Sequence, residues 1–143
     1  MKTISLALGK RRLFKLWGVG AALLFVLFLV MSVGGPLQGD PLKAWSWFLP
    51  SCFPTLLLMV GVYVAEANQP PAEDRQIDSF VFSIAVWMSA AFLALILATL
   101  LYLPFGAAPD KSMAYLERAN LWLAPVQGLA TAALGAFFVA KKK

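Results

Sequence analysis

Charged residues are scarce in this 143-residue chain, where Lys, Arg, Asp and Glu make up 13% of the sequence, against roughly 25% in ordinary soluble domains. The charges gather in short segments, and the stretches 16–39, 44–65, 79–109 and 119–140 hold none. Each stretch reaches the roughly 20 residues that cross a ~30 Å hydrocarbon core. The sequence therefore predicts an all-α integral membrane protein, a single domain of four transmembrane helices with short loops. Little chain is left for a soluble enzyme domain or for a nucleic-acid reader.

Histidine is absent, and Cys52 is the only cysteine. These counts exclude an internal disulfide and a C-x-x-C redox centre. They also exclude histidine-ligated haem, zinc held by His or paired Cys, and histidine acid–base catalysis. We therefore expect neither a metal nor a cofactor. Cys52 is expected to fill apolar space, or to form an intermolecular disulfide in an oxidising compartment.

No ionisable side chain falls at membrane depth, where such residues usually mark transport paths and proton relays. This absence argues against small multidrug antiporters that depend on an in-membrane glutamate, and against voltage sensors. No nucleophile–base pair can be assembled either, so we expect no enzyme. A lipid-modifying membrane enzyme is the weakest alternative, with Glu117, Arg118 and Asn120 as its only candidates.

Basic residues are divided unevenly between the two predicted sides. Nine Lys and Arg residues lie in the two termini and the loop 66–78, and three lie in the other two loops. The positive-inside rule then predicts that both termini are cytoplasmic, in a bacterial-type inner membrane. Four basic residues near the N-terminus are also predicted to contact anionic lipid headgroups: Lys10, Arg11, Arg12 and Lys15.

The predicted spans are 16–33, 45–65, 79–103 and 113–140. The first span ends at Gly34-Gly35-Pro36, and its 18 apolar residues exceed the roughly 7 to 15 of a signal-peptide core, so we expect an uncleaved anchor.

Capping residues and prolines predict where the later helices begin and end. Asp78 or Ser79 is expected to cap the third helix, Pro104 and Gly106 to end it, and Asp110 or Ser112 to cap the fourth.

Two prolines four residues apart, Pro50 and Pro54, lie in the second span. Because each removes a backbone donor, we expect them to break or kink the helix and to free the carbonyls of Ser46 and Pro50. In an alternative interpretation, residues 44–50 form an interfacial turn and the membrane helix begins near Ser51.

Small residues recur every four positions on the third and fourth spans, which is typical of faces where helix backbones approach closely. The spacing does not tell whether the partner helix lies within the chain or in another subunit. The predicted packing residues are Ala90, Ala94 and Ala98 on the third span, and Ala124, Gly128, Ala132 and Ala136 on the fourth.

Gln127 lies near the middle of the fourth span, two residues after Pro125. One hypothesis makes this segment a ligand site or part of a pore lined by Asn120, Pro125, Gln127 and Thr131. We favour the other, in which Gln127 hydrogen-bonds a neighbouring helix or a freed backbone group.

These patterns favour a non-catalytic accessory or assembly subunit of a membrane complex, with membrane lipids and other membrane-protein subunits as partners. The alternative is a homo-oligomeric pore or channel, including a membrane-permeabilising effector. No motif points to a particular family.

Overall fold

Four α-helices and one two-stranded sheet make up the described parts of the chain. The structure is a computed structural model that describes residues 3–67, 76–106 and 108–139. All four α-helices are long and apolar enough to cross a membrane, which confirms the predicted four-helix class. In chain order the elements are β1 (Thr3–Ser5), α1 (Leu6–Gly34), α2 (Pro41–Ala67), β2 (Gln76–Asp78), α3 (Ser79–Gly106), the 3₁₀ turn η1 (Pro109–Lys111) and α4 (Ser112–Val139).

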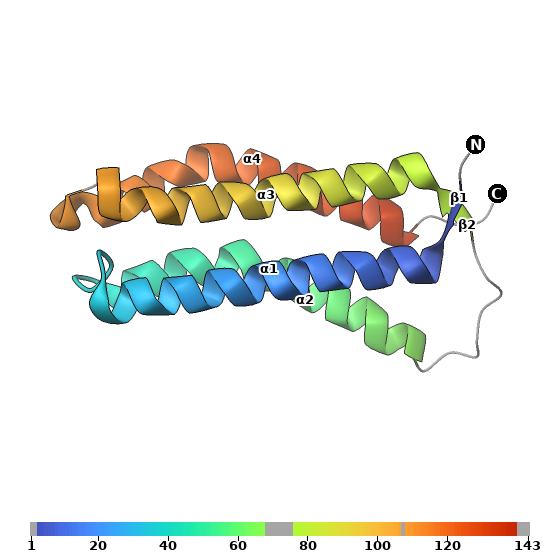
Figure 1. The fold of residues 1–143 in the computed structure, drawn as a ribbon, viewed down its shortest axis with the longest axis horizontal. Coiled ribbons are helices and arrows are strands. Elements are labelled where there is room, and N and C mark those ends of the chain that lie inside the picture. Colours follow the sequence, from blue (N-terminus) through green and yellow to red (C-terminus); the bar gives the residue numbers. More distant parts are fainter. Residues whose placement is uncertain (1–2, 68–75, 107, 140–143) are drawn as a thin grey trace.

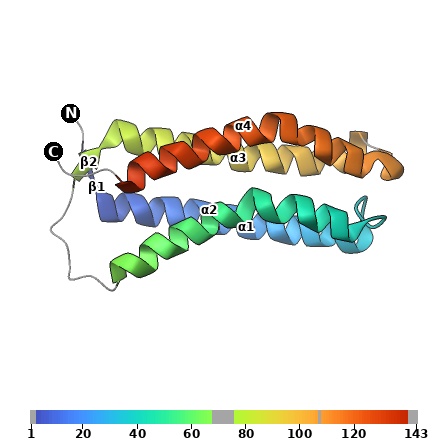
Figure 2. The same ribbon diagram turned by 180° about the vertical axis from the view of Figure 1, so that it is seen from behind.

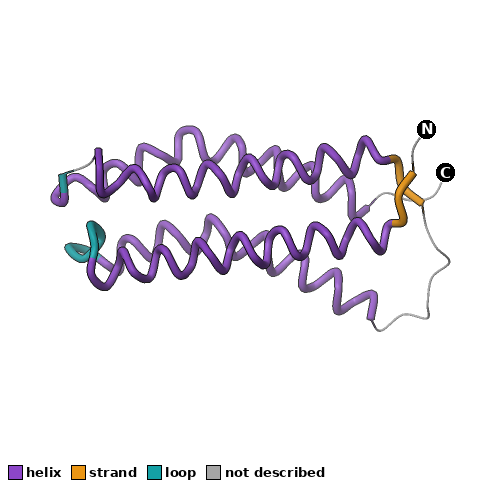
Figure 3. The backbone as a smooth tube through the Cα atoms, viewed as in Figure 1, coloured by secondary structure: helices purple, strands orange, loops and turns teal. Residues whose placement is uncertain are grey.

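The helices run up and down along one long axis (Figures 1 and 2). We call the end that carries β1 and β2 the sheet end, and the opposite end, where α1 meets α2 and α3 meets α4, the loop end (Figure 3). α1 and α3 both start at the sheet end, whereas α2 and α4 both start at the loop end. α1 packs against α2 and α3, and α4 packs against the same two helices.

Large buried side chains fill the space between the helices. Trp17 and Phe28 of α1, Phe48 of α2, Phe92 of α3 and Phe137 of α4 are each at most 1% exposed. The Phe28 and Phe48 rings stack at 4.4 Å between centroids, and Trp17 lies 6.0 Å from Phe92. These aromatic contacts join neighbouring helices along the bundle.

Three helices are longer than the predicted spans, and one of them is α2, which covers Pro41–Ala67 where 45–65 was predicted. α1 begins at Leu6, well before residue 16, and ends at Gly34 as predicted. α3 runs through Pro104 and ends at Gly106, so Gly106 is confirmed as the end of this helix and the prediction that Pro104 ends it is wrong. A proline in the last turn removes a single hydrogen bond while its φ still fits a helix.

Side-chain caps differ between the helices. The Phe80 N–H donates to Asp78 Oδ1 at 3.0 Å, which confirms Asp78 as the cap of α3. The Ser112 hydroxyl instead donates to the Ala108 carbonyl at 3.4 Å, within the turn η1 that leads into α4. α2 has a cap that was not predicted from the sequence, since the Lys43 N–H donates to Asp40 Oδ1 at 3.2 Å.

Both prolines of the second span lie inside a continuous helix. The prolines were predicted to break or kink the helix. α2 is unbroken from Pro41 to Ala67, so the break is wrong, and so is the alternative turn over 44–50. The half of α2 towards the sheet end diverges from the other helices (Figures 1 and 2), as expected where prolines interrupt the backbone hydrogen bonds.

A short antiparallel sheet joins the start of the chain to the start of α3. Thr3 pairs with Asp78, Ile4 with Ile77, and Ser5 with Gln76. The Thr3 hydroxyl also donates to Gln76 Oε1 at 2.7 Å. This sheet holds the first turns of α1 and α3 at the same end of the bundle.

Candidate functional site

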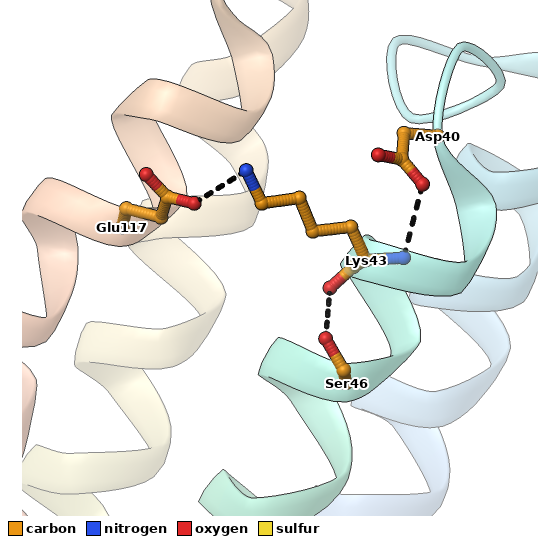
Figure 4. Close-up of polar contacts among 4 residues, drawn as sticks. All are labelled: Asp40, Lys43, Ser46 and Glu117. Carbon is orange, nitrogen blue, oxygen red and sulfur yellow. Dashed lines mark hydrogen bonds and ion pairs between the residues drawn. The ribbon is translucent and has the colours of Figure 1, made fainter.

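Polar contacts between α2 and α4 begin at the loop end. The Lys43 ammonium lies 2.7 Å from Glu117 Oε1, and both side chains are about half exposed. Lys43 reaches from the first turn of α2 across to α4 (Figure 4). Around it, Asp40 accepts from the Lys43 backbone N–H, and the Ser46 hydroxyl donates to the Lys43 carbonyl at 2.7 Å. This exposed ion pair links α2 to α4 at the loop end.

One turn further along α2, an indole N–H reaches a carboxamide of α4. Trp47 Nε1 donates to Asn120 Oδ1 at 2.9 Å, and the Trp47 side chain is buried. A buried indole N–H usually requires such a partner, because leaving it unpaired carries a desolvation cost. Asn120 therefore aligns α4 with α2.

Gln127 supplies the third contact of the set, and it acts on a backbone group that a proline has freed. Its side-chain Nε2 donates to the Pro50 carbonyl at 3.3 Å and to the Ser51 carbonyl at 3.4 Å. In a regular helix the Pro50 carbonyl would accept from the backbone N–H of residue 54, but that residue is Pro54 and has none. The Gln127 carboxamide thus replaces the missing donor, in agreement with the hypothesis that it bonds a neighbouring helix.

The residues suggested for a pore are divided by the fold. Asn120 and Gln127 are engaged with α2, whereas Pro125 and Thr131 are exposed on α4. Within one copy of the chain, these four side chains form no common lining.

The small residues of α4 lie on the outside of the bundle. Ala124, Gly128, Ala132 and Ala136 are all exposed, and we call them the α4 small-residue face. A Cβ added at Gly128 would meet no atom within 4 Å. The core positions of α4 lie elsewhere on the helix, at Leu116, Ala119, Leu123, Ala130, Leu134 and Phe137. The α4 small-residue face therefore does not pack against the parts of the chain that the structure describes.

The small residues predicted for α3 are also turned away from the core. Ala94 and Ala98 are exposed, and Ala90 is half-buried. The side chains that α3 buries come from other turns of the helix, among them Ala85, Phe92, Ile96 and Leu103. α3 and α4 share the most extensive helix interface, yet the predicted small-residue faces do not form it.

The four basic residues near the N-terminus separate into two groups. The Lys10 side chain is buried, 7% exposed, with its Nζ 5.7 Å from the centre of the Phe138 ring of α4. Arg11, Arg12 and Lys15 are exposed on α1. Three of the four predicted headgroup ligands are therefore accessible, while Lys10 also stabilises the contact between α1 and α4.

The residues considered for catalysis, disulfide formation or metal binding do not form a common site. Glu117 pairs with Lys43 and Asn120 with Trp47, while Arg118 is exposed. Cys52 is free and buried in α2, at 1% exposed. Among residues 3–67, 76–106 and 108–139, no group of three or more His, Cys, Asp or Glu residues could hold a metal ion.

Sequence reasoning missed two buried polar atoms, Trp17 Nε1 and Ser89 Oγ, which have no hydrogen-bond partner in the described part of the chain. Hydropathy gives no signal for them, because both lie in apolar stretches.

Comparison of the chain with protein-family models, with curated proteins and with solved structures finds no match.

Proposed function

We propose that the protein is a non-catalytic accessory or assembly subunit of a membrane complex, inserted with both termini in the cytoplasm. The α4 small-residue face binds a transmembrane helix of another chain. The observation that carries the proposal is the exposure of this face.

A face of alanine and glycine lets two helix backbones approach closely, and in a bilayer such packing is a main source of helix association. The length of the face favours a helix as its occupant. From Ala124 to Ala136 it extends about 18 Å at 1.5 Å per residue, more than half of a ~30 Å hydrocarbon core. A lipid chain of one leaflet would cover only part of this length, whereas a transmembrane helix covers all of it.

Membrane insertion is supported by the apolar side chains that the bundle presents on its outside. Val19, Leu23, Val33 and Leu121 are each more than 60% exposed. Such an apolar surface is unfavourable in water and is typical of a lipid-facing bundle. The sign asymmetry of the loops supports the proposed orientation.

The test of the partner interface compares two glycines. Gly128→Leu adds a bulky side chain to the α4 small-residue face, and Gly61→Leu adds the same side chain at another exposed helical glycine with open space around it. Both changes raise helix propensity equally. We expect wild type and Gly61→Leu to purify in mild detergent with a stoichiometric partner chain, and Gly128→Leu to purify alone with its thermal stability kept.

The mass of the purified particle shows whether the proposal fails. A Gly128→Leu protein that keeps its partner would contradict the proposed interface. A wild-type particle made only of copies of this chain would contradict the accessory role and favour the homo-oligomeric pore.

Orientation is tested separately by cysteine labelling. In a Cys52→Ala background, Gly39→Cys at the loop end should react with a membrane-impermeant reagent added to intact cells, and Lys143→Cys should not. The reverse pattern would overturn the proposed orientation.

A further inference from the structure

An open groove of about 500 Å³ runs between the middle parts of α1 and α3, from Lys15 to Leu24 on α1 and from Ala90 to Leu97 on α3. Its walls are apolar except at one end, where a lysine is part of the lining. The volume lies within the roughly 300–1,000 Å³ of small-ligand sites. The residues that define its ends and its floor are Lys15, Gly20 and Leu24 on α1, and Ala90, Ala94 and Leu97 on α3.

Small residues of both helices line the groove, where Gly20 lets Leu93 approach α1 closely and two alanines of α3 leave space open. Gly20 has no side chain, and the tip of Leu93 lies 2.8 Å from the position that a Cβ would take there. Along α3, Ala90 and Ala94 leave space open on the side that faces away from the core. Larger side chains at these two alanines would fill the groove without entering the bundle core.

The groove has the depth of one bilayer leaflet. From Lys15 to Leu24 it extends about 14 Å at 1.5 Å per residue, close to half of a ~30 Å hydrocarbon core. A partner helix would need a face that continues through the second leaflet, as the α4 small-residue face does. A groove that stops near the midplane instead matches a single lipid chain.

Within the groove, positive charge lies only at the end nearer the sheet, which we call the mouth. Lys15 lines it, and Arg11 and Arg12, four and three residues earlier in the same helix, lie on the same side of α1. All three are exposed, and none forms an ion pair with another residue of the described ranges. On α3, Trp87 lies one turn before Ala90 with 72% of its surface exposed, and tryptophan favours the headgroup region.

We propose that this groove binds one acyl chain of an anionic phospholipid, whose phosphate contacts Lys15, Arg11 and Arg12. Apolar walls, one-leaflet depth and a basic mouth together fit this occupant. The inference rests on the proposed membrane insertion with the sheet end in the cytoplasm, which places the mouth at the inner leaflet. It does not depend on the partner at the α4 small-residue face.

The experiment measures lipid retained by the full-length protein in mild detergent, using native mass spectrometry with phosphatidylglycerol and phosphatidylcholine of equal chain length. Wild type is expected to retain one phosphatidylglycerol in preference to phosphatidylcholine. Ala90→Leu combined with Ala94→Leu should lose it, and so should Ala94→Leu alone, a change at an exposed position that does not threaten folding. The matched control, Ala91→Leu with Ala98→Leu, alters two exposed alanines of α3 outside the groove and should retain the lipid.

The charges at the mouth are tested with Arg11→Gln, Arg12→Gln and Lys15→Gln. Each basic side chain removed should weaken phosphatidylglycerol binding about fivefold, whereas Lys111→Gln and Arg118→Gln at the loop end should leave it unchanged.

Three results would overturn the proposal. They are equal retention of phosphatidylcholine, retention of phosphatidylglycerol by Ala94→Leu, and a change in the mass of a protein complex when the groove is filled, which would assign the groove to a helix. Gly128→Leu should keep the lipid even where it loses the partner chain, so the two proposals can fail separately.

Discussion

The two ends of the bundle are built differently, although the same four helices form both. At the loop end, α2 is joined to α1 by buried rings and to α4 by the contacts of Lys43, Trp47 and Pro50. At the sheet end, α2 diverges, and a short sheet connects the starts of α1 and α3, while the open groove between these two helices lies further along them. The difference indicates that the loop end supplies much of the stability of the bundle, whereas the sheet end holds α2 less closely.

The largest expected difference between the two ends concerns two pairs of stacked aromatic rings, each joining α1 to α2. Phe28 stacks on Phe48 at the loop end and is fully buried, whereas Phe14 stacks on Tyr63 at the sheet end and is 39% exposed. Phe28→Ala should lower the free energy of unfolding by about 3–5 kcal/mol, because it leaves a cavity. Phe14→Ala should cost about 1 kcal/mol, the value of an exposed ring pair. Reversible unfolding in mixed detergent micelles measures both, and equal losses would contradict the difference between the ends.

The next largest effect is expected at Gln127. Gln127→Leu removes the donor to the Pro50 carbonyl, and an unpaired backbone group should cost about 2 kcal/mol. In a Pro54→Ala background, residue 54 regains its N–H, so the same change should cost much less. The control is Thr131→Val, one turn along α4 at an exposed position. If the cost of Gln127→Leu is the same in both backgrounds, Gln127 does not replace the donor that Pro54 lacks.

A smaller effect is expected from the indole contact. Trp47→Phe keeps a ring but removes the donor to Asn120, and interhelical hydrogen bonds of this kind are worth about 0.6–1 kcal/mol. A double-mutant cycle of Trp47→Phe with Asn120→Leu should give a coupling energy of that size. A coupling near zero would show that the 2.9 Å contact adds no stability.

The smallest effect is expected from the exposed ion pair. Lys43→Gln should reduce the free energy of unfolding by about 0.2–1 kcal/mol, and the loss should shrink as salt is added, because exposed pairs are screened. Unfolding measured at low and at high salt checks this. A loss that does not change with salt would mean that Lys43 acts through something other than its charge.

The four helices were predictable because scarce charge and long apolar stretches are properties of the chain itself. The path of α2 was not, since proline rules describe a helix alone, and the donor for Pro50 comes from Gln127, 77 residues away. The ends of α1 were only half predictable, because Gly34 ends a helix locally while charged residues before residue 16 are equally compatible with helix and loop.

The candidate surfaces were predictable only in part. Ala124, Gly128, Ala132 and Ala136 recur every four residues and are all exposed, but the same spacing occurs on buried and on exposed faces, so the spacing did not predict their exposure. The groove between α1 and α3 requires Gly20 to lie opposite Ala90 and Ala94, and this pairing depends on how the helices align. The regular spacing of small residues along one helix does not show how that helix aligns with another.

The small sheet has a consequence for topology that does not depend on charge. Residues 3–5 can pair with residues 76–78 only if both segments lie on the same side of a bilayer. The chain between them must then cross an even number of times, so α1 and α2 either both span or neither does. The pairing also cannot form until β2 has been synthesised. In a bilayer, the pairing is therefore compatible only with an even number of crossings between the two strands.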